Sequence, residues 1–132
     1  MATLAMTIDN FEDTILNNDI VLIDFWAGWC QPCRAFGPIF EKVSDNHPDI
    51  VFAKVDTEAE QEIAEQFGIR SIPTLAIFRD KVLLFNQAGA LPEATLEEVL
   101  ARVKDLDMDE VRAVIAEEKA KAEAEGEPSN DA

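Results

Sequence analysis

The run IVLIDFWA, at residues 20–27, constrains the fold more than any other stretch of the chain. It is almost wholly apolar and rich in β-branched residues, which is the pattern of a strand covered on both faces. Such strands lie in the middle of sheets that carry helices on either side. The run therefore predicts a central strand, and Asp24 is its one charged residue.

The segments around this run alternate between strand and helix patterns. Upstream, we expect a short strand at 4–7 and a short helix that begins at Asp9 or Asn10. Downstream, apolar residues at helical spacing predict a helix from the cysteines to Pro48. The other expected elements are a strand at 50–56, a helix at 58–68, two strands at 74–79 and 82–88, and a helix at 91–106.

This order of elements predicts the α/β class, with a central mixed β-sheet flanked by helices on both faces. The strands at 74–79 and 82–88 are joined only by Asp80 and Lys81, so they are expected to pair as an antiparallel hairpin. Because the turn contains no glycine, the sequence leaves its type open.

The composition changes after Lys104. Residues 105–132 hold ten acidic and three basic residues, against 17 and 8 in residues 1–104. We therefore expect a folded domain at 1–104 and an acidic C-terminal extension at 105–132. The extension is predicted to be helical to about residue 125, and the final GEPSNDA is predicted to be disordered.

The extension carries two further helical patterns. Asp107 and Glu110 are spaced like a capping box with Asp in place of Ser or Thr. A short apolar stripe follows at Met108, Val111, Val114 and Ile115. This stripe is expected either to pack back on the domain or to bind a partner helix.

The net charge of −16 disfavours nucleic acids and anionic membranes as partners. Residues 20–27 are too few to span a bilayer, and the first residues resemble neither a secretory signal nor a transit peptide. We therefore expect a cytoplasmic protein that is a monomer by default. Thiols remain reduced in that compartment, so the cysteine pair is expected to be catalytic or metal-binding.

Both cysteines lie in the segment WAGWCQPCR, at positions 30 and 33. If Cys30 ends a strand-to-helix connection, the backbone N–H groups and the positive end of the helix dipole favour its thiolate. Residues three apart on a helix share a face, so Cys33 can reach the sulfur of Cys30. The spacing suits an exposed attacking thiolate and a protected resolving thiol, and Pro32 suits the first helical turn.

Zinc is the alternative for this pair, because His47 follows Cys33 at a spacing that resembles half of a zinc finger. A finger needs a fourth ligand about three to five residues later. Residues 51–53 are Val, Phe and Ala, and His47 is the only histidine of the chain. We therefore expect no metal.

Asp24 admits two interpretations. It points to water if its strand is partly exposed, or it is buried with a raised pKa, as a proton acceptor beside a thiol requires. Lys54, in the strand expected at 50–56, is a candidate partner if the two strands are neighbours.

Several of these segments together resemble the thioredoxin family. They are VLIDFWAGWCQPCR, Pro38, AKVD, GIRSIPT and AGAL, in the order and at the spacing of that family, and the resemblance covers about residues 1–104. Gln31-Pro32 replaces the commonest Gly-Pro between the cysteines, and the extension lies beyond the usual family end. The resemblance implies the thioredoxin fold and protein-disulfide reductase activity that maintains redox homeostasis.

The resemblance also implies roles for individual residues. Cys30 corresponds to the nucleophile and Cys33 to the resolving thiol. Asp24 corresponds to the carboxylate that accepts the proton of Cys33 through water, and Lys54 to its companion. The residues implied to bind target proteins are Trp29, Gln31, Pro32, Ile72, Gly89 and Pro73, which matches the family's cis-proline.

By the same resemblance, the chain carries no cofactor and receives electrons from a thioredoxin reductase, on which NADPH and a flavin are expected. Its other partners are expected to be target proteins with disulfides. Two alternatives stay open. One is a chaperone-like or docking module that uses the C-terminal helix, and the other is an oxidase or isomerase that uses the same thiols.

Overall fold

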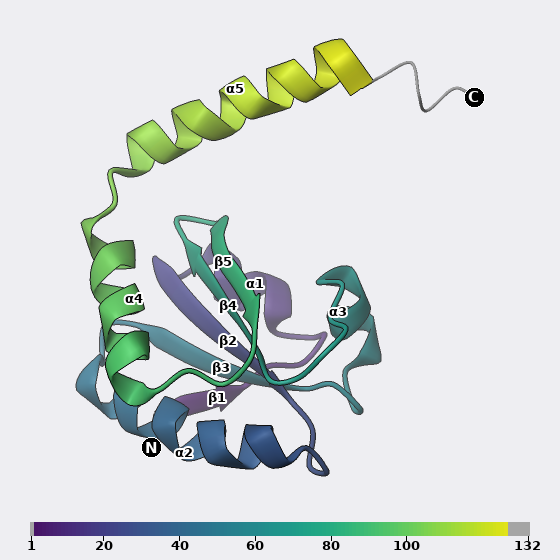
Figure 1. Cartoon of the computed structure of the whole chain (residues 1–132), viewed down its shortest axis with the longest axis vertical. Coiled ribbons are helices and arrows are strands. Elements are labelled where there is room, and N and C mark those ends of the chain that lie inside the picture. Colours follow the sequence, from purple (N-terminus) through teal and green to yellow (C-terminus); the bar gives the residue numbers. More distant parts are fainter. Residues whose placement is uncertain (1, 127–132) are drawn as a thin grey trace.

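The computed structural model describes residues 2–126 of the chain, and in this part a single five-stranded sheet carries five helices. The strands are β1 (Thr3–Ala5), β2 (Ile20–Trp26), β3 (Val51–Asp56), β4 (Thr74–Arg79) and β5 (Val82–Ala88). The helices are α1 (Phe11–Leu16), α2 (Gln31–Asn46), α3 (Gln61–Gln66), α4 (Glu93–Asp105) and α5 (Met108–Gly126). Figure 1 shows their arrangement.

The sheet has the order β1-β3-β2-β4-β5, so β2 is its central strand. β1 and β2 pair in parallel with β3, whereas β4 pairs antiparallel with β2 and with β5. The sheet is therefore mixed, as predicted. β2 carries the IVLIDFW run and every residue but the last is buried, because helices cover both of its faces.

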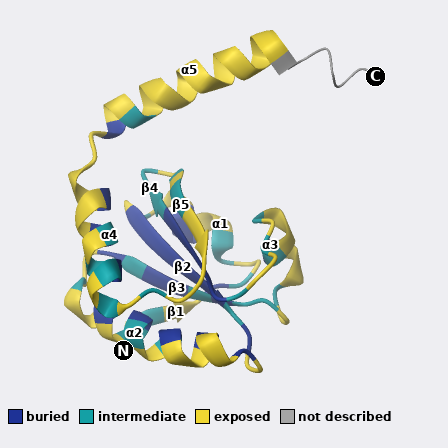
Figure 2. Cartoon of the chain, viewed as in Figure 1, coloured by how far each residue is buried: buried dark blue, intermediate teal, exposed yellow. Residues whose placement is uncertain are grey.

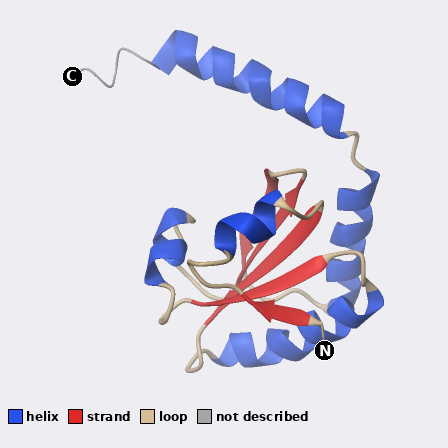
Figure 3. Cartoon of the chain, turned by 180° about the vertical axis from the view of Figure 1, so that it is seen from behind, coloured by secondary structure: helices blue, strands red, loops and turns tan. Residues whose placement is uncertain are grey.

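Alternate residues of β2 face two separate layers of the core. Leu22 packs with residues of α2 and α4, such as Phe36 and Leu100. Ile23 belongs to the opposite cluster, which includes Ile63 of α3. Figures 1 and 3 show helices on the two sides of the sheet, which confirms the predicted α/β architecture.

The β4–β5 hairpin has the predicted bounds, and its geometry identifies the turn. Asp80 and Lys81 both have positive φ, of 51° and 70°. Positive φ at both central residues characterises a type I′ turn, whose twist matches that of the flanking strands. Asp and Lys occupy positions here that glycine and asparagine usually take.

The first strand ends earlier than predicted, at Ala5 instead of Thr7. The side chain of Asn10 explains this, because its Oδ1 accepts from the backbone N–H of Thr7 at 2.9 Å and its Nδ2 donates to the Ala5 carbonyl at 3.0 Å. Asn10 is the N-cap of α1, as one of the two predictions had it, but its side chain makes no bond to the first turn of that helix.

Arg79, the last residue of β4, ties the end of α4 to the sheet. One guanidinium nitrogen donates to the carbonyl oxygens of Val103, Lys104 and Leu106, at 2.8, 3.2 and 2.8 Å. Carbonyls at a helix C-terminus have no partner within the helix. Arg79 therefore satisfies these groups and fixes the linker that leads to α5.

α5 begins at the predicted capping residue and then leaves the domain. Oδ1 of Asp107 accepts from the backbone N–H groups of Asp109 and Glu110, at 3.0 and 3.3 Å. Met108 is buried, but Val114 and Ile115 are 58% and 45% exposed. The predicted stripe thus packs on the domain only at its start, and Figure 2 shows most of α5 exposed.

Among the described residues, α5 is linked to the hairpin by a charged contact between Arg112 Nη1 and Asp80 Oδ2 at 3.7 Å. Figure 1 shows α5 on the far side of the domain from the N-terminal end of α2. Disorder was expected for residues 126–132, but Gly126 is the last residue of α5, and residues 127–132 lie outside the described part of the chain. No helix in the described part is long and apolar enough to cross a membrane.

Candidate redox site

Cys30 and Cys33 form a disulfide at the point where the chain passes from β2 into α2, with their Cα atoms 5.2 Å apart. Cys30 is the N-cap of α2, and its Sγ accepts a hydrogen bond from the backbone N–H of Cys33 at 3.2 Å. Pro32 lies in the first helical turn, as predicted. The sulfur of Cys30 therefore occupies the positive end of the helix, where a thiolate is stabilised.

The disulfide is less exposed than the sequence suggested. Cys30 was expected to be exposed, but it is 3% exposed and Cys33 is 5% exposed. Trp26, Ala27 and Ile72 pack around the pair. Ile72 comes from a distant part of the chain, so its covering of the disulfide could not be predicted from the spacing of the cysteines.

The loop before β4 meets the disulfide from the other side. The Ile72–Pro73 peptide bond is cis, in agreement with the family's pattern, and the Ile72 carbonyl oxygen lies 3.6 Å from Cys30 Sγ. The backbone N–H of Gly89 donates to the Pro73 carbonyl at 2.8 Å. Gly89 has a φ of 110°, which residues with a side chain rarely adopt.

Trp29 stands out from the surface beside the disulfide, with 67% of the residue exposed. Its indole Nε1 donates to Glu58 Oε2 at 3.0 Å, which holds the ring in place. Gln31 and Pro32 are also exposed, in the first turn of α2. An exposed aromatic ring held by a hydrogen bond is suited to contact with another protein.

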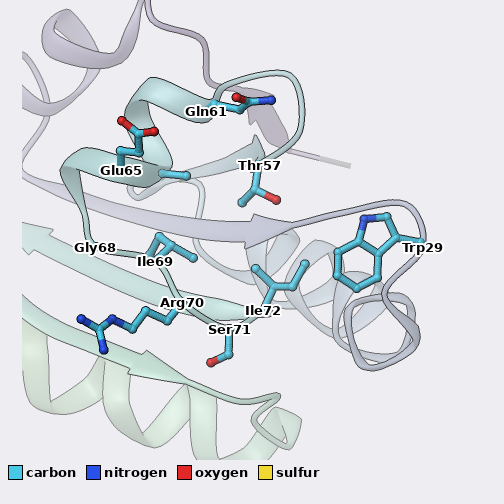
Figure 4. A pocket seen from close by; sticks show the side chains of 10 residues that line it. Trp29, Thr57, Gln61, Glu65, Gly68, Ile69, Arg70, Ser71 and Ile72 are labelled. Atoms are coloured by element: carbon cyan, nitrogen blue, oxygen red, sulfur yellow. The ribbon is translucent and has the colours of Figure 1, made fainter.

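A pocket of about 500 Å³ opens next to Trp29. Figure 4 shows the ring at one end of it, with Gln61 and Glu65 of α3 on one side and Arg70, Ser71 and Ile72 on the other. The pocket lies within reach of the disulfide, because Ile72 contributes both to the pocket and to the packing around the cysteines.

Asp24 is buried, and this decides between the two interpretations of that residue. It is 1% exposed, and among the described residues neither carboxyl oxygen has a hydrogen-bond partner. Burial raises its pKa to about 7, although Lys54 acts to lower it and Glu41 to raise it. A carboxyl group with such a pKa can both take and release a proton near neutral pH.

Lys54 is the residue of β3 that pairs in register with Asp24. Its ammonium group lies 4.0 Å from Glu41 Oε2 and 5.4 Å from the centre of the Trp26 ring. The two strands are neighbours, as a partnership of Asp24 and Lys54 requires, but among the described residues neither carboxyl oxygen of Asp24 accepts a hydrogen bond from Lys54. The ion pair of Lys54 with Glu41 was not predicted.

Three of these side chains share a cavity behind the disulfide. The cavity measures about 460 Å³ and is lined by Cys33, Glu41 and Lys54, together with Arg34 and Gly37 and with residues of the preceding loop. Ile72, which packs against the cysteines, is not among the residues that line this cavity. Protonatable groups therefore have access to the resolving cysteine.

Arg34 and Glu41 were not predicted from the sequence as residues of the site. The Arg34 guanidinium donates twice to the Gly28 carbonyl, at 2.9 and 3.2 Å, and so braces the loop that carries Trp29. Glu41 follows Cys33 and Gly37 at intervals of four residues. That spacing places all three on one side of a helix, and it is the signal that could have identified Glu41.

His47 lies at the opposite end of α2 from Cys30, as the C-cap of the helix. Its Nε2 pairs with Glu97 Oε1 of α4 at 2.6 Å. A helix of this length separates its ends by about 24 Å, so the zinc-finger alternative fails on geometry. Within residues 2–126, no group of three His, Cys, Asp or Glu side chains could hold a metal ion.

Comparison with known proteins identifies a matching family model and several similar sequences. A family model described as Thioredoxin matches residues 2–102. A putative thioredoxin 2 of Streptomyces coelicolor is 54% identical over 121 residues, which cover 92% of this chain and 90% of that protein. A thioredoxin of Porphyra purpurea is 39% identical over 102 residues, or 76% of this chain and 95% of its own.

Solved structures agree with the sequence comparisons. A mutant thioredoxin from Halobacterium salinarum superposes with a TM-score of 0.74 at 30% identity, over 80% of this chain and 93% of that one. The match to the Streptomyces protein spans 121 residues. Because this exceeds the 104 residues of the expected domain, it includes part of the C-terminal extension.

Proposed function

The chain belongs to the thioredoxin family, and on that basis we propose how its residues divide the work of a protein-disulfide reductase. The activity itself follows from the family and from the Cys30–Cys33 pair, which is a redox-active disulfide. The observation that carries the proposal is the position of Cys30, whose Sγ accepts a backbone hydrogen bond at the N-terminus of α2.

In the reduced protein, Cys30 is the nucleophile. Its thiolate attacks one sulfur of a target disulfide, a bond forms between the two sulfurs, and the second target sulfur leaves and takes up a proton. The backbone N–H of Cys33 and the helix dipole stabilise the thiolate before attack. The product of this step is a mixed disulfide between the target and Cys30.

Cys33 resolves the mixed disulfide. It loses its proton, attacks Cys30 Sγ, and displaces the target as a thiolate that is then protonated. Two electrons have then passed to the target, and Cys30–Cys33 is oxidised. We propose that Asp24 accepts the proton of Cys33 and that Lys54 is its companion. The burial of Asp24 and the cavity that joins Lys54 to Cys33 support these roles.

Targets dock around the disulfide on the exposed side of the site. Trp29 and Ile72 provide apolar contact, and the backbone of Ile72 pairs with an extended segment of the target. Pro73 and Gly89, joined by a hydrogen bond of 2.8 Å, support that segment. Gln31 and Pro32 complete the surface next to the nucleophile, because both are exposed in the first turn of α2.

The oxidised protein must regain two electrons. We propose that a thioredoxin reductase supplies them, with NADPH and a flavin bound on that partner, and that the protein works as a monomer in the cytoplasm. Disulfide-containing proteins are then its substrates. Residues 1–104 carry the activity, since α5 lies on the far side of the domain from α2's N-terminal end.

Insulin reduction tests this proposal, because reduced insulin chains aggregate and the turbidity can be followed in the presence of dithiothreitol. The wild-type protein is expected to shorten the lag, whereas Cys30→Ser is expected to behave like dithiothreitol alone. Ile115→Ser, a change on the exposed part of α5, serves as the control and should retain activity. Full activity of Cys30→Ser would refute the assignment.

A further inference from the structure

Glu41 lies in the middle of α2, where its carboxylate meets two strands of the sheet. Its Oε2 accepts a hydrogen bond from Thr3 Oγ1 of β1 at 2.9 Å and lies 4.0 Å from Lys54 Nζ of β3. Its Oε1 is buried without a hydrogen-bond partner among the described residues. Burying a carboxylate oxygen without a partner is unfavourable because the oxygen loses its solvation. The neighbouring charged groups explain why Glu41 lies here.

Lys54 lies between two carboxyl groups. Asp24 is its register partner on β2, and Glu41 approaches it from α2. A Cβ atom built on Gly37 would lie 3.7 Å from Lys54 Nζ, so the ammonium group lies against α2 at that residue. Lys54 is therefore shared, and its attraction to Glu41 competes with its attraction to Asp24.

We propose that Glu41 is a positioning residue for the proton transfer at Cys33, because it holds the Lys54 ammonium at the cavity wall. With Lys54 shared in this way, Asp24 is not permanently neutralised as an ion pair. Asp24 can then take a proton and return it near neutral pH. This inference rests on the proposed role of Asp24 as proton acceptor. It adds Glu41 as the residue that keeps Asp24 able to exchange a proton.

The charged groups near Asp24 come from β3 and α2. Lys54 faces it from β3, and α2 contributes Glu41 and Arg34 to the same cavity as Cys33. On the other side, the register partner of Asp24 is the uncharged Leu75 of β4. The opposing influences of Lys54 and Glu41 on the pKa of Asp24 have the directions that this arrangement requires.

The test is the titration of the Asp24 carboxyl carbon by NMR in the oxidised protein. Glu41→Gln removes the negative charge that competes with Asp24 for Lys54, so that Lys54 then interacts with Asp24 alone. The Asp24 midpoint is therefore expected to fall from about 7 by about one pH unit. Glu93→Gln is the matched control, since it removes the same charge from a surface pair with Lys42, and it should leave the midpoint in place.

A second variant separates the effect of the position of Glu41 from the effect of its charge. Thr3→Val keeps Glu41 but removes the hydrogen bond that holds its Oε2, so the Asp24 midpoint is expected to fall by a smaller amount. It also provides the test if Glu41→Gln does not fold. An Asp24 midpoint that is unchanged in whichever of the two variants folds, relative to Glu93→Gln, would overturn the inference.

The kinetic readout links the shift to catalysis. The pH at which target release from the mixed disulfide is half-maximal is expected to move with the Asp24 midpoint in Glu41→Gln. If Asp24→Asn releases targets at the wild-type rate, the proposed role of Asp24 is wrong, and that result is distinct from the NMR result. A shifted midpoint with an unshifted release profile would likewise refute the positioning role of Glu41.

Discussion

Asp24 and Lys54 are paired in register on the adjacent strands β2 and β3. They lie on the face of the sheet that α2 covers, since their neighbours Leu22 and Phe52 pack in the same cluster as Phe36 of α2. A charged pair thus replaces apolar residues directly beneath the helix that starts with the redox disulfide. This arrangement predicts consequences for stability and for catalysis.

Asp24 makes stability depend on pH. Its pKa is about 7 in the folded chain, against 3.8 for an ordinary aspartate, so the folded state prefers the protonated form. The penalty is absent below pH 3.8, grows as the pH rises toward 7, and is constant above it. Replacing Asp24 by Asn, which has no charge at any pH, should remove this dependence.

The expected size of the effect is about 4 kcal/mol between pH 4 and pH 8.5. It is measured as the difference in unfolding free energy between Asp24→Asn and the wild type, from denaturant curves of the oxidised proteins. Asp49→Asn is the contrast, because the pKa of Asp49 is lowered, chiefly by a backbone hydrogen bond. A difference for Asp24→Asn that stays constant with pH would contradict the assigned burial.

Trp29 is expected to affect protein substrates more than small ones. Because 67% of it is exposed beside the disulfide, Trp29→Ala should raise KM for insulin about tenfold, equivalent to about 1.4 kcal/mol. Reduction of a small aromatic disulfide should change little. Leu83→Ala, which alters another exposed apolar residue, is the control, and an equal rise in KM there would exclude a specific role.

Two truncations separate the parts of α5. A chain that ends after Arg112 keeps the buried Met108 and the contact with Asp80, so it should be as stable as the full chain. A chain that ends after Asp107 loses the buried Met108. Its free energy of unfolding should therefore be about 2 kcal/mol lower than that of the full chain. Both should reduce insulin at the wild-type rate, and a loss of activity would place the extension in the site.

Arg79 is expected to matter for stability and not for activity. Arg79→Met removes the three hydrogen bonds to the end of α4 and its linker, which should cost about 1 to 3 kcal/mol. Arg102→Met, a change of an exposed arginine on α4, is the matched control in thermal unfolding. Equal stability of the two variants would show that Arg79 does not fix the helix end.

The elements of the fold could be predicted because their patterns are local. The apolar run at 20–27 identified the central strand, and the polar pair Asp80-Lys81 separated two strands whose bounds the structure confirms. The end of β1 could not be predicted in the same way. It depends on the side chain of Asn10, which reaches back to Ala5 and Thr7.

The redox pair could likewise be predicted from the sequence, because the spacing of the cysteines and Pro32 are properties of a single helical turn. The cavity behind Cys33 could not be predicted in this way. It depends on the register of β2 against β3 and on the side of α2 that faces the sheet. Glu41 belongs to this second group, because its significance arises only when Thr3 and Lys54 are brought to it.

The most direct test of the account is the rate at which Cys30 of the reduced protein reacts with iodoacetamide as a function of pH. Cys33→Ser isolates that thiol. Its position at the N-terminus of α2 predicts a rate profile with a midpoint clearly below that of a free cysteine, which is about 8.5. A midpoint at the free-cysteine value would contradict the claim that the helix activates Cys30.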